Sequence, residues 1–596
     1  MKCLRFFSLA AVAFLLLLDT SEHRMSGAQA VPGGASFAQY QTAHISTEAV
    51  TTSQYLAMRD GVRLAVSITR PSKDGKPMEG RFPVIWQHAL SIAAPGILRS
   101  QTGAGGYGSV PSLAFDGYVV VQVARRGQGP SFGKRRGYND RTEANDAYEV
   151  TDWLAAQPWS TGMIGMYGCS NTGDAAMHAV TSANPHLKAV WAGCFSWEKY
   201  DGFWRGGIYA NWGTGPERTI EQDMTSIPVQ GDEAKILLRQ AAEEHQGATV
   251  LTAMWSAMPF RDDYAPGVGT RFWYEGSVAT YLPQIVASGT AVYIQGGWRD
   301  DLRGQGLQAF ANIKADKHVV IGPWGHCQSD GLDLVAEMHR FFDQHLKGIN
   351  TGILGQDAIR YYTVNAEVGK EWRSSKVWPV AGTKPTRFYM DGHGPAGGEL
   401  QTGGPAATAA QTVFTVRYDV DAPNAPRAGA GLLTGAPPRP VEAGGPRFAT
   451  APLKSDIEVT GDAIVDLWMS STATDGNIFV YLEDVAPDGA VTQVTDARLK
   501  ASLRKMSKPQ YENFGLPYHA SLREEARPLK PGEPVELVFA FLPTSFVFRK
   551  GHTIRISIAG ADYRERDRTG VSPAPVVTLY NTPEHPSFVS LPIVNE

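Results

Sequence analysis

Short apolar runs rich in β-branched residues alternate with helical patterns between residues 54 and 350. The runs predict strands at residues 64–69, 83–87, 118–123, 164–167, 189–192, 292–295 and 319–321. Residues 143–156 and 332–346 instead repeat their apolar side chains at the spacing of one helix face. Strands that alternate with helices in this way predict a mostly parallel sheet covered by helices.

The pattern changes twice along the chain. Between residues 197 and 289 the strand signal lapses, and helical stretches such as 233–245 mix with loops rich in Trp, Tyr and Phe, which predicts a helical insertion. From residue 373 onward, alternating runs take over at residues 464–469, 478–482, 535–541 and 553–558. These runs predict a separate all-β sandwich, and the Gly-, Ala- and Pro-rich residues 392–445 predict long loops within it or leading into it.

The N-terminus has the pattern of an export signal. Lys2 and Arg5 precede an apolar run at residues 6–18, and Ala28-Gln29-Ala30 offers a small-residue cleavage site. The run is shorter than the roughly 20 apolar residues that span a bilayer, which favours a cleaved signal over a membrane anchor. We therefore expect a secreted or periplasmic chain that begins near Val31 and has no membrane partner.

Five segments follow from these patterns. They are a signal peptide at 1–30, an α/β core at 31–197 and 290–372, a helical cap at 198–289 and a C-terminal β-sandwich at 373–596. The 596 residues, 43% of them hydrophobic, suffice for several globular cores. The net charge is -4 without a cluster of Lys and Arg, so nucleic acid is not an expected partner. No cofactor or metal is expected, since His-x-x-x-His and Cys-x-x-Cys spacings do not occur.

A glycine-flanked serine follows the predicted strand at 164–167. The stretch GCSNTG at residues 168–173 precedes an Ala-rich helical run at 174–182. In a strand–turn–helix of this kind, glycines permit the sharp turn that projects the serine hydroxyl into a site. The helix N-terminus and the backbone N–H of Asn171 would face a developing oxyanion. Ser170 is therefore the predicted nucleophile.

A serine hydroxyl needs a base and an acid that orients the base. Asp300 follows the predicted strand at 292–295, and His326 follows the one at 319–321. Both lie at carboxyl ends of strands, where open α/β sheets keep their active sites, and the order Ser, Asp, His is that of α/β-hydrolases. Asp301 is the alternative acid, and either aspartate could instead cap the helix that follows.

These motifs resemble those of the cocaine esterase and X-Pro dipeptidyl-peptidase group of α/β-hydrolases, which also includes α-amino acid ester hydrolases and glutaryl-cephalosporin acylases. The resemblance spans nearly the whole mature chain. It rests on MRDGVRL at residues 58–64, WLAAQPW at 153–159, the serine motif, GWRD at 297–300, GPWGH at 322–326, FFD to LKG across 341–348, and EWR at 371–373.

The resemblance implies an α/β-hydrolase with a helical cap and a C-terminal jelly roll of the galactose-binding-like type. It also implies Ser170, Asp300 and His326 as the triad, with Asn171 in place of the usual Tyr after the serine. The Tyr that supplies the second oxyanion donor in relatives falls on Ser91 by register. Ser91 has a shorter side chain, so His88 and Tyr107 are alternative donors.

We expect hydrolysis of an ester or amide through an acyl-enzyme on Ser170, acting on a small molecule or short peptide. Trp197, Trp204, Trp273 and Trp298 are the candidate substrate-binding residues, although aromatic side chains this dense also serve to pack a cap. Asp262, Asp263 or Glu217 could hold a substrate amine or lie solvated at the surface. The alternative function is an exported peptide- or carbohydrate-binding protein on a hydrolase fold with weak or no catalysis. Homo-oligomerisation is left open.

Three cysteines remain after removal of the signal, namely Cys169, Cys194 and Cys327. Cys169 adjoins the nucleophile and Cys194 ends the next predicted strand, which suggests a disulfide between them. Three buried free thiols are the alternative.

Overall fold

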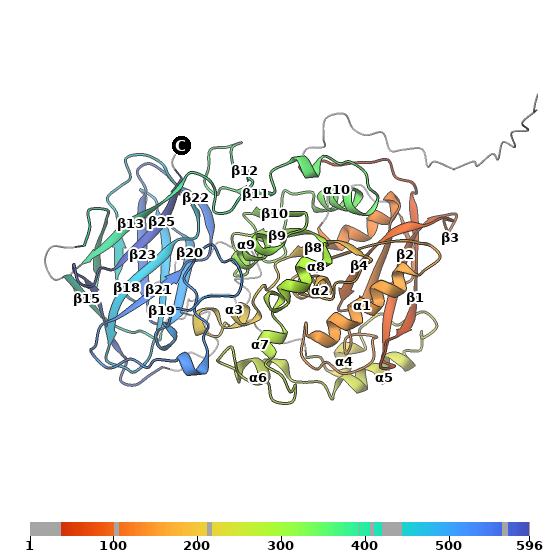
Figure 1. Ribbon diagram of the computed structural model, residues 1–596, viewed down its shortest axis with the longest axis horizontal. Coiled ribbons are helices and arrows are strands. Elements are labelled where there is room, and N and C mark those ends of the chain that lie inside the picture. Colours follow the sequence, from red (N-terminus) through yellow and green to blue (C-terminus); the bar gives the residue numbers. More distant parts are fainter. Residues whose placement is uncertain are drawn as a thin grey trace, which may run out of the picture.

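The computed structural model describes residues 37–99, 106–210, 217–392, 394–405, 410–419, 444–562 and 570–594. It shows an α/β domain beside a C-terminal all-β domain (Figure 1). The predicted signal peptide lies outside the described residues. Within the described part of the chain, no helix combines the length and the apolarity that crossing a membrane requires.

The first domain is built on a mixed sheet that is parallel in its centre. In spatial order its strands are β12 (Trp372–Ser375), β11 (Ile359–Tyr362), β10 (Lys317–Gly322), β9 (Ala291–Gly297), β8 (Leu187–Gly193), β7 (Ser160–Cys169), β4 (Phe82–Ala89), β6 (Val119–Ala124), β2 (Arg63–Lys73), β1 (Glu48–Ala57) and β5 (Gly96–Arg99). The short β3 (Lys76–Pro77) pairs with β2. The seven neighbouring strands β11, β10, β9, β8, β7, β4 and β6 are parallel. Strand β12 at one end and the group β1, β2, β3 and β5 at the other pair antiparallel.

Helices bury both faces of this sheet, which explains why its central strands are almost continuously apolar. One face is covered by α1 (Arg141–Ala155), α2 (Asn171–Val180), α8 (Leu282–Ser288) and α9 (Arg303–Asn312). The other face is covered by η1 (Tyr107–Asp116) and α10 (Leu334–Leu346), and η4 (Ile353–Gly355) follows α10. Successive residues of a strand serve the two cores alternately, as Ile85 and Trp86 of β4 do.

A mainly helical insertion joins β8 to β9, as the loss of strand alternation predicts. It contains α3 (Lys199–Phe203), η2 (Arg205–Gly207), α4 (Ile220–Asp223), α5 (Ile236–His245), α6 (Leu251–Ser256), α7 (Phe272–Glu275) and η3 (Val278–Tyr281), and ends in α8. Helices α4 to α7 lie along the lower edge of the α/β domain in Figure 1. The insertion has an aromatic core of its own, which includes Tyr200, Trp204, Trp255 and Trp273.

The second domain is all-β and encloses a separate hydrophobic core. Its strands are β13 (Thr383–Gly392), β14 (Gly397–Gln401), β15 (Ala410–Thr415), β16 (Arg447–Ala449), β17 (Ile457–Gly461), β18 (Ile464–Ser471), β19 (Asn477–Val485), β20 (Val491–Lys500), β21 (Val535–Ala540), β22 (Thr544–Phe548), β23 (Thr553–Ala559), β24 (Val576–Asn581) and β25 (Phe588–Val594). Two short 3₁₀ turns, η5 (Ala501–Leu503) and η6 (Arg523–Glu525), lie between β20 and β21.

Two details differ from the sequence prediction. Strand β12 pairs with β11, so the first sheet continues past residue 373, and the change of sheet falls between Ser375 and Thr383. Within the expected loop region at 392–445, β14 pairs with β13 and β15 pairs with β24, while residues 420–443 lie outside the described part. Short strands that add to a sheet edge need few apolar residues, which is why the pattern does not reveal them.

Candidate active site

Ser170 lies on a sharp turn between β7 and α2. Its backbone has φ 59° and ψ -130°, a conformation that an L-residue adopts at a cost of about 1–3 kcal/mol and that is typical of functional sites. The turn is anchored on both sides: the Ser170 N–H donates to the carbonyl of Gly193 at 3.0 Å, and the Ser170 carbonyl accepts from Asp174 N at 2.8 Å. This is the local geometry of a nucleophile elbow.

Two glycines make the elbow sterically possible. A Cβ at Gly168 would lie 2.3 Å from the carbonyl oxygen of Thr172, and a Cβ at Gly173 would lie 2.3 Å from that of Gly193. Both distances are far below van der Waals contact with backbone atoms that cannot swing away. The spacing of these glycines around Ser170 therefore follows from the close approach of α2 to β7 and β8.

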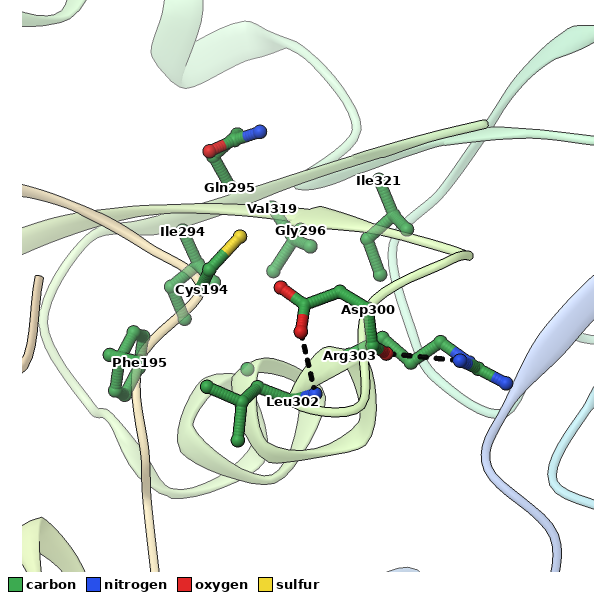
Figure 2. Close-up of a pocket in the computed structure, with 11 residues that line it drawn as sticks. Cys194, Phe195, Ile294, Gln295, Gly296, Asp300, Leu302, Arg303, Val319 and Ile321 are labelled. Atoms are coloured by element: carbon green, nitrogen blue, oxygen red, sulfur yellow. Dashed lines mark hydrogen bonds between the residues drawn. The ribbon is translucent and has the colours of Figure 1, made fainter. Parts of the chain in front are cut away.

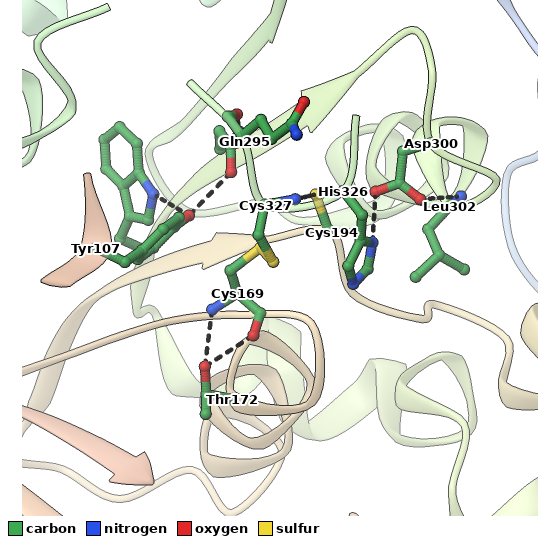
Figure 3. The surroundings of a disulfide bond; sticks show 11 residues. Tyr107, Cys169, Thr172, Cys194, Gln295, Asp300, Leu302, His326 and Cys327 are labelled. Carbon is green, nitrogen blue, oxygen red and sulfur yellow. Dashed lines mark hydrogen bonds and ion pairs between the residues drawn. A yellow bond between two sulfur atoms is a disulfide. The ribbon is translucent and has the colours of Figure 1, made fainter. Parts of the chain in front are cut away.

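Asp300 and His326 meet at the carboxyl ends of β9 and β10. Nδ1 of His326 lies 2.9 Å from Oδ2 of Asp300, and Oδ1 of Asp300 accepts from Leu302 N at 3.0 Å. Figure 3 shows the imidazole and the carboxylate pointing toward one another. A carboxylate at Nδ1 fixes the tautomer that leaves Nε2 as the basic nitrogen.

Electrostatics favour an ionised acid next to a basic imidazole. Burial disfavours the charged His326, but the negative charge of Asp300 and the hydrogen bond to it outweigh burial and raise the pKa of His326 above its usual 6.5. Burial likewise opposes ionisation of Asp300, yet His326, the Cys194 thiol and the Leu302 N–H together lower the pKa of Asp300. Both shifts favour the charged forms, so the site stabilises the ion pair of carboxylate and imidazolium that forms when His326 accepts a proton.

The neighbouring Asp301 has a different partner. Its Oδ2 lies 3.3 Å from Nη2 of Arg498, a residue of β20 in the all-β domain, and both side chains are buried. Arg303 strengthens the same junction, since it donates to the Asp300 carbonyl at 3.0 Å, to Thr495 Oγ1 at 2.8 Å and to the Pro543 carbonyl at 2.8 Å. The second domain therefore holds the loop that carries the acid.

A disulfide joins Cys169 to Cys327, so the predicted pairing of Cys169 with Cys194 is wrong. Cys194 does follow β8, the neighbour of β7, but it is a free, buried thiol. Its Sγ accepts from Cys327 N at 3.3 Å and its thiol lies against Asp300. Burial, together with the negative charge of Asp300, raises the pKa of Cys194. The side chain is therefore turned toward the acid, and the loop after β10 reaches Cys169 instead (Figure 3).

A small cavity lies beside Asp300 (Figure 2). It is lined by residues from the ends of β8, β9 and β10 and from α9, among them Cys194, Asp300 and Arg303. Because most of these lining residues are buried, the cavity belongs to the packing around Asp300.

Sequence reasoning missed the buried charges beneath the elbow. Arg125, fully buried, donates to Asn139 Oδ1 at 2.7 Å, to the His88 carbonyl at 3.3 Å and to the Asn171 carbonyl at the start of α2. Asp174, one turn into α2, accepts from Lys199 Nζ at 2.7 Å and from Ser196 N at 2.6 Å. The dipeptide Arg125-Arg126, which follows a buried strand, is the sequence signal that could have drawn attention to Arg125.

The oxyanion candidates occupy different surroundings. Asn171 is the first residue of α2, so its N–H points out of the helix start, whereas Ser91 lies in the bend after β4. The Tyr107 hydroxyl donates to Gln295 Oε1 at 2.9 Å and accepts from Trp191 Nε1 at 3.0 Å. His88 is buried, and its Nε2 has no hydrogen-bond partner among the residues that the structure describes.

The four candidate tryptophans are buried within packed clusters. Trp197 and Trp298 belong to the core on the sheet face that α1, α2, α8 and α9 cover, and Trp204 and Trp273 belong to the core of the cap. The indole N–H groups of Trp204, Trp273 and Trp298 donate to backbone carbonyls at 3.1, 3.0 and 2.6 Å. These are the surroundings that the packing alternative describes, and substrate binding by these residues stays a prediction.

The three candidate amine-binding carboxylates also have partners within the chain. Asp262 accepts from Arg523 N at 3.0 Å, and Asp263 accepts from Phe260 N at 2.9 Å and pairs with the Arg523 side chain. Glu217 accepts from Leu251 N at 2.6 Å at the start of α6. Their observed roles are to join the two domains and to cap a helix.

Comparison with known proteins places the chain in a family. The model for X-Pro dipeptidyl-peptidase (S15 family) matches residues 60–328, and the model for the X-Pro dipeptidyl-peptidase C-terminal non-catalytic domain matches residues 351–590. A Mycobacterium tuberculosis protein named "Putative serine esterase" is 30% identical over 91% of this chain and 95% of its own length. Cocaine esterase from a Rhodococcus species is 27% identical over 91% and 98%.

Solved structures share the architecture. A CocE/NonD family hydrolase from Staphylococcus aureus superposes with a TM-score of 0.68 at 19% identity, covering 94% of this chain and 95% of its own. An α-amino acid ester hydrolase superposes with a TM-score of 0.66, also at 19% identity, covering 92% and 97%. With its α/β domain, its all-β domain and these relatives, the chain belongs to the X-Pro dipeptidyl-peptidase (S15) family and is a serine hydrolase.

Proposed function

We propose that this protein is an exported hydrolase that cleaves an ester or an amide through an acyl-enzyme on Ser170, with His326 as base and Asp300 as the acid that orients it. The observation that carries the proposal is the convergence of three loops. Cα atoms of Cys169 and Cys327 lie 5.8 Å apart, and each residue adjoins one member of the proposed pair of nucleophile and base. Since consecutive Cα atoms are 3.8 Å apart, those of Ser170 and His326 lie within about 13 Å.

In the first step His326 Nε2 accepts the hydroxyl proton as Ser170 Oγ attacks the substrate carbonyl carbon. The tetrahedral oxyanion accepts from the Asn171 N–H at the positive end of α2. The resulting imidazolium, stabilised by Asp300, then gives its proton to the leaving alcohol or amine. The carbon–heteroatom bond breaks and the acyl group stays on Ser170.

In the second step water replaces the leaving group. His326 takes a proton from the water as its oxygen attacks the acyl carbon, and then returns that proton to Ser170 Oγ as the acid product departs. The second oxyanion donor stays a prediction. Ser91 and His88 remain candidates, whereas the Tyr107 hydroxyl already donates to Gln295.

Two further observations support the proposal. The relatives carry the names serine esterase, cocaine esterase and Xaa-Pro dipeptidyl-peptidase, which supports esters and amides as the substrate classes. Export is supported by Lys2 and Arg5, the apolar run at 6–18 and the Ala28-Gln29-Ala30 site.

The test is a substrate panel of aryl esters, amino acid esters and Xaa-Pro amides, run with the wild type and with Ser170→Ala. We expect hydrolysis of at least one class and a loss of about a million-fold in kcat in the variant. Hydrolysis that survives unchanged in folded Ser170→Ala would contradict the proposal. Sequencing the N-terminus of the protein collected outside the cell tests export, with a start near Val31 as the expected result.

A further inference from the structure

We propose that the Cys169–Cys327 disulfide is a positioning element of the active site: it holds the base loop against the nucleophile elbow and makes hydrolysis depend on the oxidised state of the bridge. The inference rests on the proposed function. It concerns residues that do not themselves touch the reacting atoms, but that adjoin the two that do.

The sheet order places the two loops on strands that are not neighbours. Ser170 follows β7 and His326 follows β10, and β8 and β9 lie between these two strands. At the usual spacing of strands, the ends of β7 and β10 are about 14 Å apart. The loop after β10 must therefore turn back across the ends of two strands before an imidazole on it can reach the serine.

The contacts of the loop trace this path. Gln295, near the end of β9, donates from Nε2 to the Gln328 carbonyl at 2.8 Å. Cys194, after β8, accepts from Cys327 N at 3.3 Å. The disulfide then joins Cys327 to Cys169, the last residue of β7. The loop therefore makes one contact with the end of each strand that it crosses, and the disulfide attaches it to the elbow (Figure 3).

The position of the disulfide in the sequence explains how it can affect the placement of Ser170 and His326. Cys169 directly precedes Ser170, and Cys327 directly follows His326. A shift of either cysteine therefore also moves the backbone of the adjoining proposed catalytic residue. A misplacement of about 1 Å in such a site can reduce the rate about a hundredfold. Without the bridge, the two cysteines are connected only along the chain, at a sequence separation of 158 that includes the cap and the strands β8, β9 and β10.

The third cysteine lies close enough to exchange with the bridge, since the Sγ atoms of Cys169, Cys194 and Cys327 lie within 4.8 Å of one another. Exchange needs a thiolate, and the buried thiol of Cys194 beside the Asp300 carboxylate has a raised pKa, which keeps it protonated. The pairing of Cys169 with Cys327 is therefore maintained, and Cys194 serves as a partner of Asp300.

The bridge is open to chemical reduction. Cys327 is partly exposed, so a small dithiol can attack the disulfide. Dithiothreitol delivers two electrons and two protons: the S–S bond breaks, Cys169 and Cys327 become thiols, and the reagent closes into its cyclic disulfide. In an oxidising compartment the bridge forms again, which agrees with the proposed export.

The experiment measures kcat and KM for p-nitrophenyl acetate before and after reduction of the full-length protein. We expect kcat to fall by about 10- to 100-fold, with KM changed less than about twofold, because positioning and not binding is lost. Diamide, which oxidises the dithiol back to the disulfide, should restore kcat. Non-reducing peptide mapping should show the Cys169–Cys327 link before reduction and free thiols after it.

Three controls separate positioning from stability and from reagent effects. The double variant Cys169→Ser/Cys327→Ser should have the low kcat and should not respond to dithiothreitol, whereas Cys194→Ser should keep the bridge and the response. Far-UV circular dichroism and the unfolding midpoint show whether the reduced protein is folded at the assay temperature. Reduced protein with free thiols that keeps its full kcat would overturn the inference, as would a kcat that falls only in step with unfolding.

The proposed function is tested separately in the oxidised wild type. A fluorophosphonate adduct on Ser170 there, together with a redox-insensitive kcat, would leave the hydrolase assignment standing and remove the role of the bridge. Absence of any adduct on Ser170 in the oxidised protein would instead refute the function itself.

Discussion

Ser170 and the Asp300–His326 pair lie on neighbouring loops, but different kinds of contact hold them. The elbow is fixed by close backbone packing within the α/β domain, namely the two glycines at 168 and 173 and the hydrogen bonds of the Ser170 backbone, one of which reaches Gly193 at the end of β8. The acid loop is fixed by distant parts of the chain, above all by Arg498 and Thr495 of the all-β domain. The proposed nucleophile is thus held within the α/β domain, while the proposed acid also depends on contacts with the all-β domain.

Among changes that leave Ser170 in place, the largest effect should come from breaking the acid–base pair. Asp300→Asn keeps the size of the side chain but presents the wrong hydrogen-bonding group to His326 Nδ1, so kcat should fall about 10,000-fold. Steady-state kinetics on an aryl ester measure this. The matched control is Asp301→Asn, whose side chain pairs with Arg498, and it should lose far less. Equal losses in the two variants would refute the assignment of the acid.

The elbow should be sensitive to a single methyl group. In Gly173→Ala the new Cβ would meet the Gly193 carbonyl at 2.3 Å, so α2 must move away from β8. We expect a loss of about 1–3 kcal/mol in the free energy of unfolding, measured by urea titration, and slower labelling of Ser170. Gly355→Ala, where a Cβ meets nothing within 4 Å, is the control and should be nearly neutral.

The link to the all-β domain should have a smaller effect on turnover. Arg498→Ala removes the buried partner of Asp301 and should lower kcat by about tenfold, by loosening the loop that holds Asp300. Arg523→Ala breaks a pair with Asp263 at the same domain junction, but Arg523 is 63% exposed, so its loss should cost little. A full kcat in folded Arg498→Ala would show that the second domain does not position the acid.

The pH dependence should show the smallest effect. His326 must be neutral to accept a proton, and Asp300 raises its pKa, so kcat/KM should rise with pH through a midpoint above 6.5. In Asp300→Asn the stabilising charge is gone, and the midpoint of the residual activity should move to lower pH. A midpoint that does not move would contradict the influence of Asp300 on His326.

The central parallel strands could be predicted from the sequence because their burial on both faces leaves an unbroken apolar signal. The run at 292–295 became β9 (Ala291–Gly297), and the run at 189–192 became β8 (Leu187–Gly193). The pattern does not reveal strand β1, because it lies near the sheet edge and two of its buried residues, Thr51 and Ser53, are polar. Periodicity reveals a strand only where burial and hydrophobicity alternate together, and in β1 they do not.

The placement of the candidate site residues could be predicted as far as it depends on where strands end. Ser170, Asp300 and His326 each follow a strand in the order that the motifs indicate, and the structure brings Asp300 to His326. The disulfide could not be predicted in this way, because the loop after β10 crosses two strands to reach Cys169. The tryptophans show a second limit: composition gathers aromatic residues in the cap but does not separate packing from a pocket.

The most direct test of the account is the rate at which a fluorophosphonate labels Ser170, with the adduct located by peptide mass spectrometry. We predict an adduct on Ser170 in the wild type and labelling about 100- to 10,000-fold slower in His326→Ala, because the hydroxyl has lost its base. His186→Ala, a histidine that bonds the Gly162 carbonyl at 3.2 Å, should label at the wild-type rate. An adduct on another residue, or undiminished labelling of Ser170 in His326→Ala, would contradict the account.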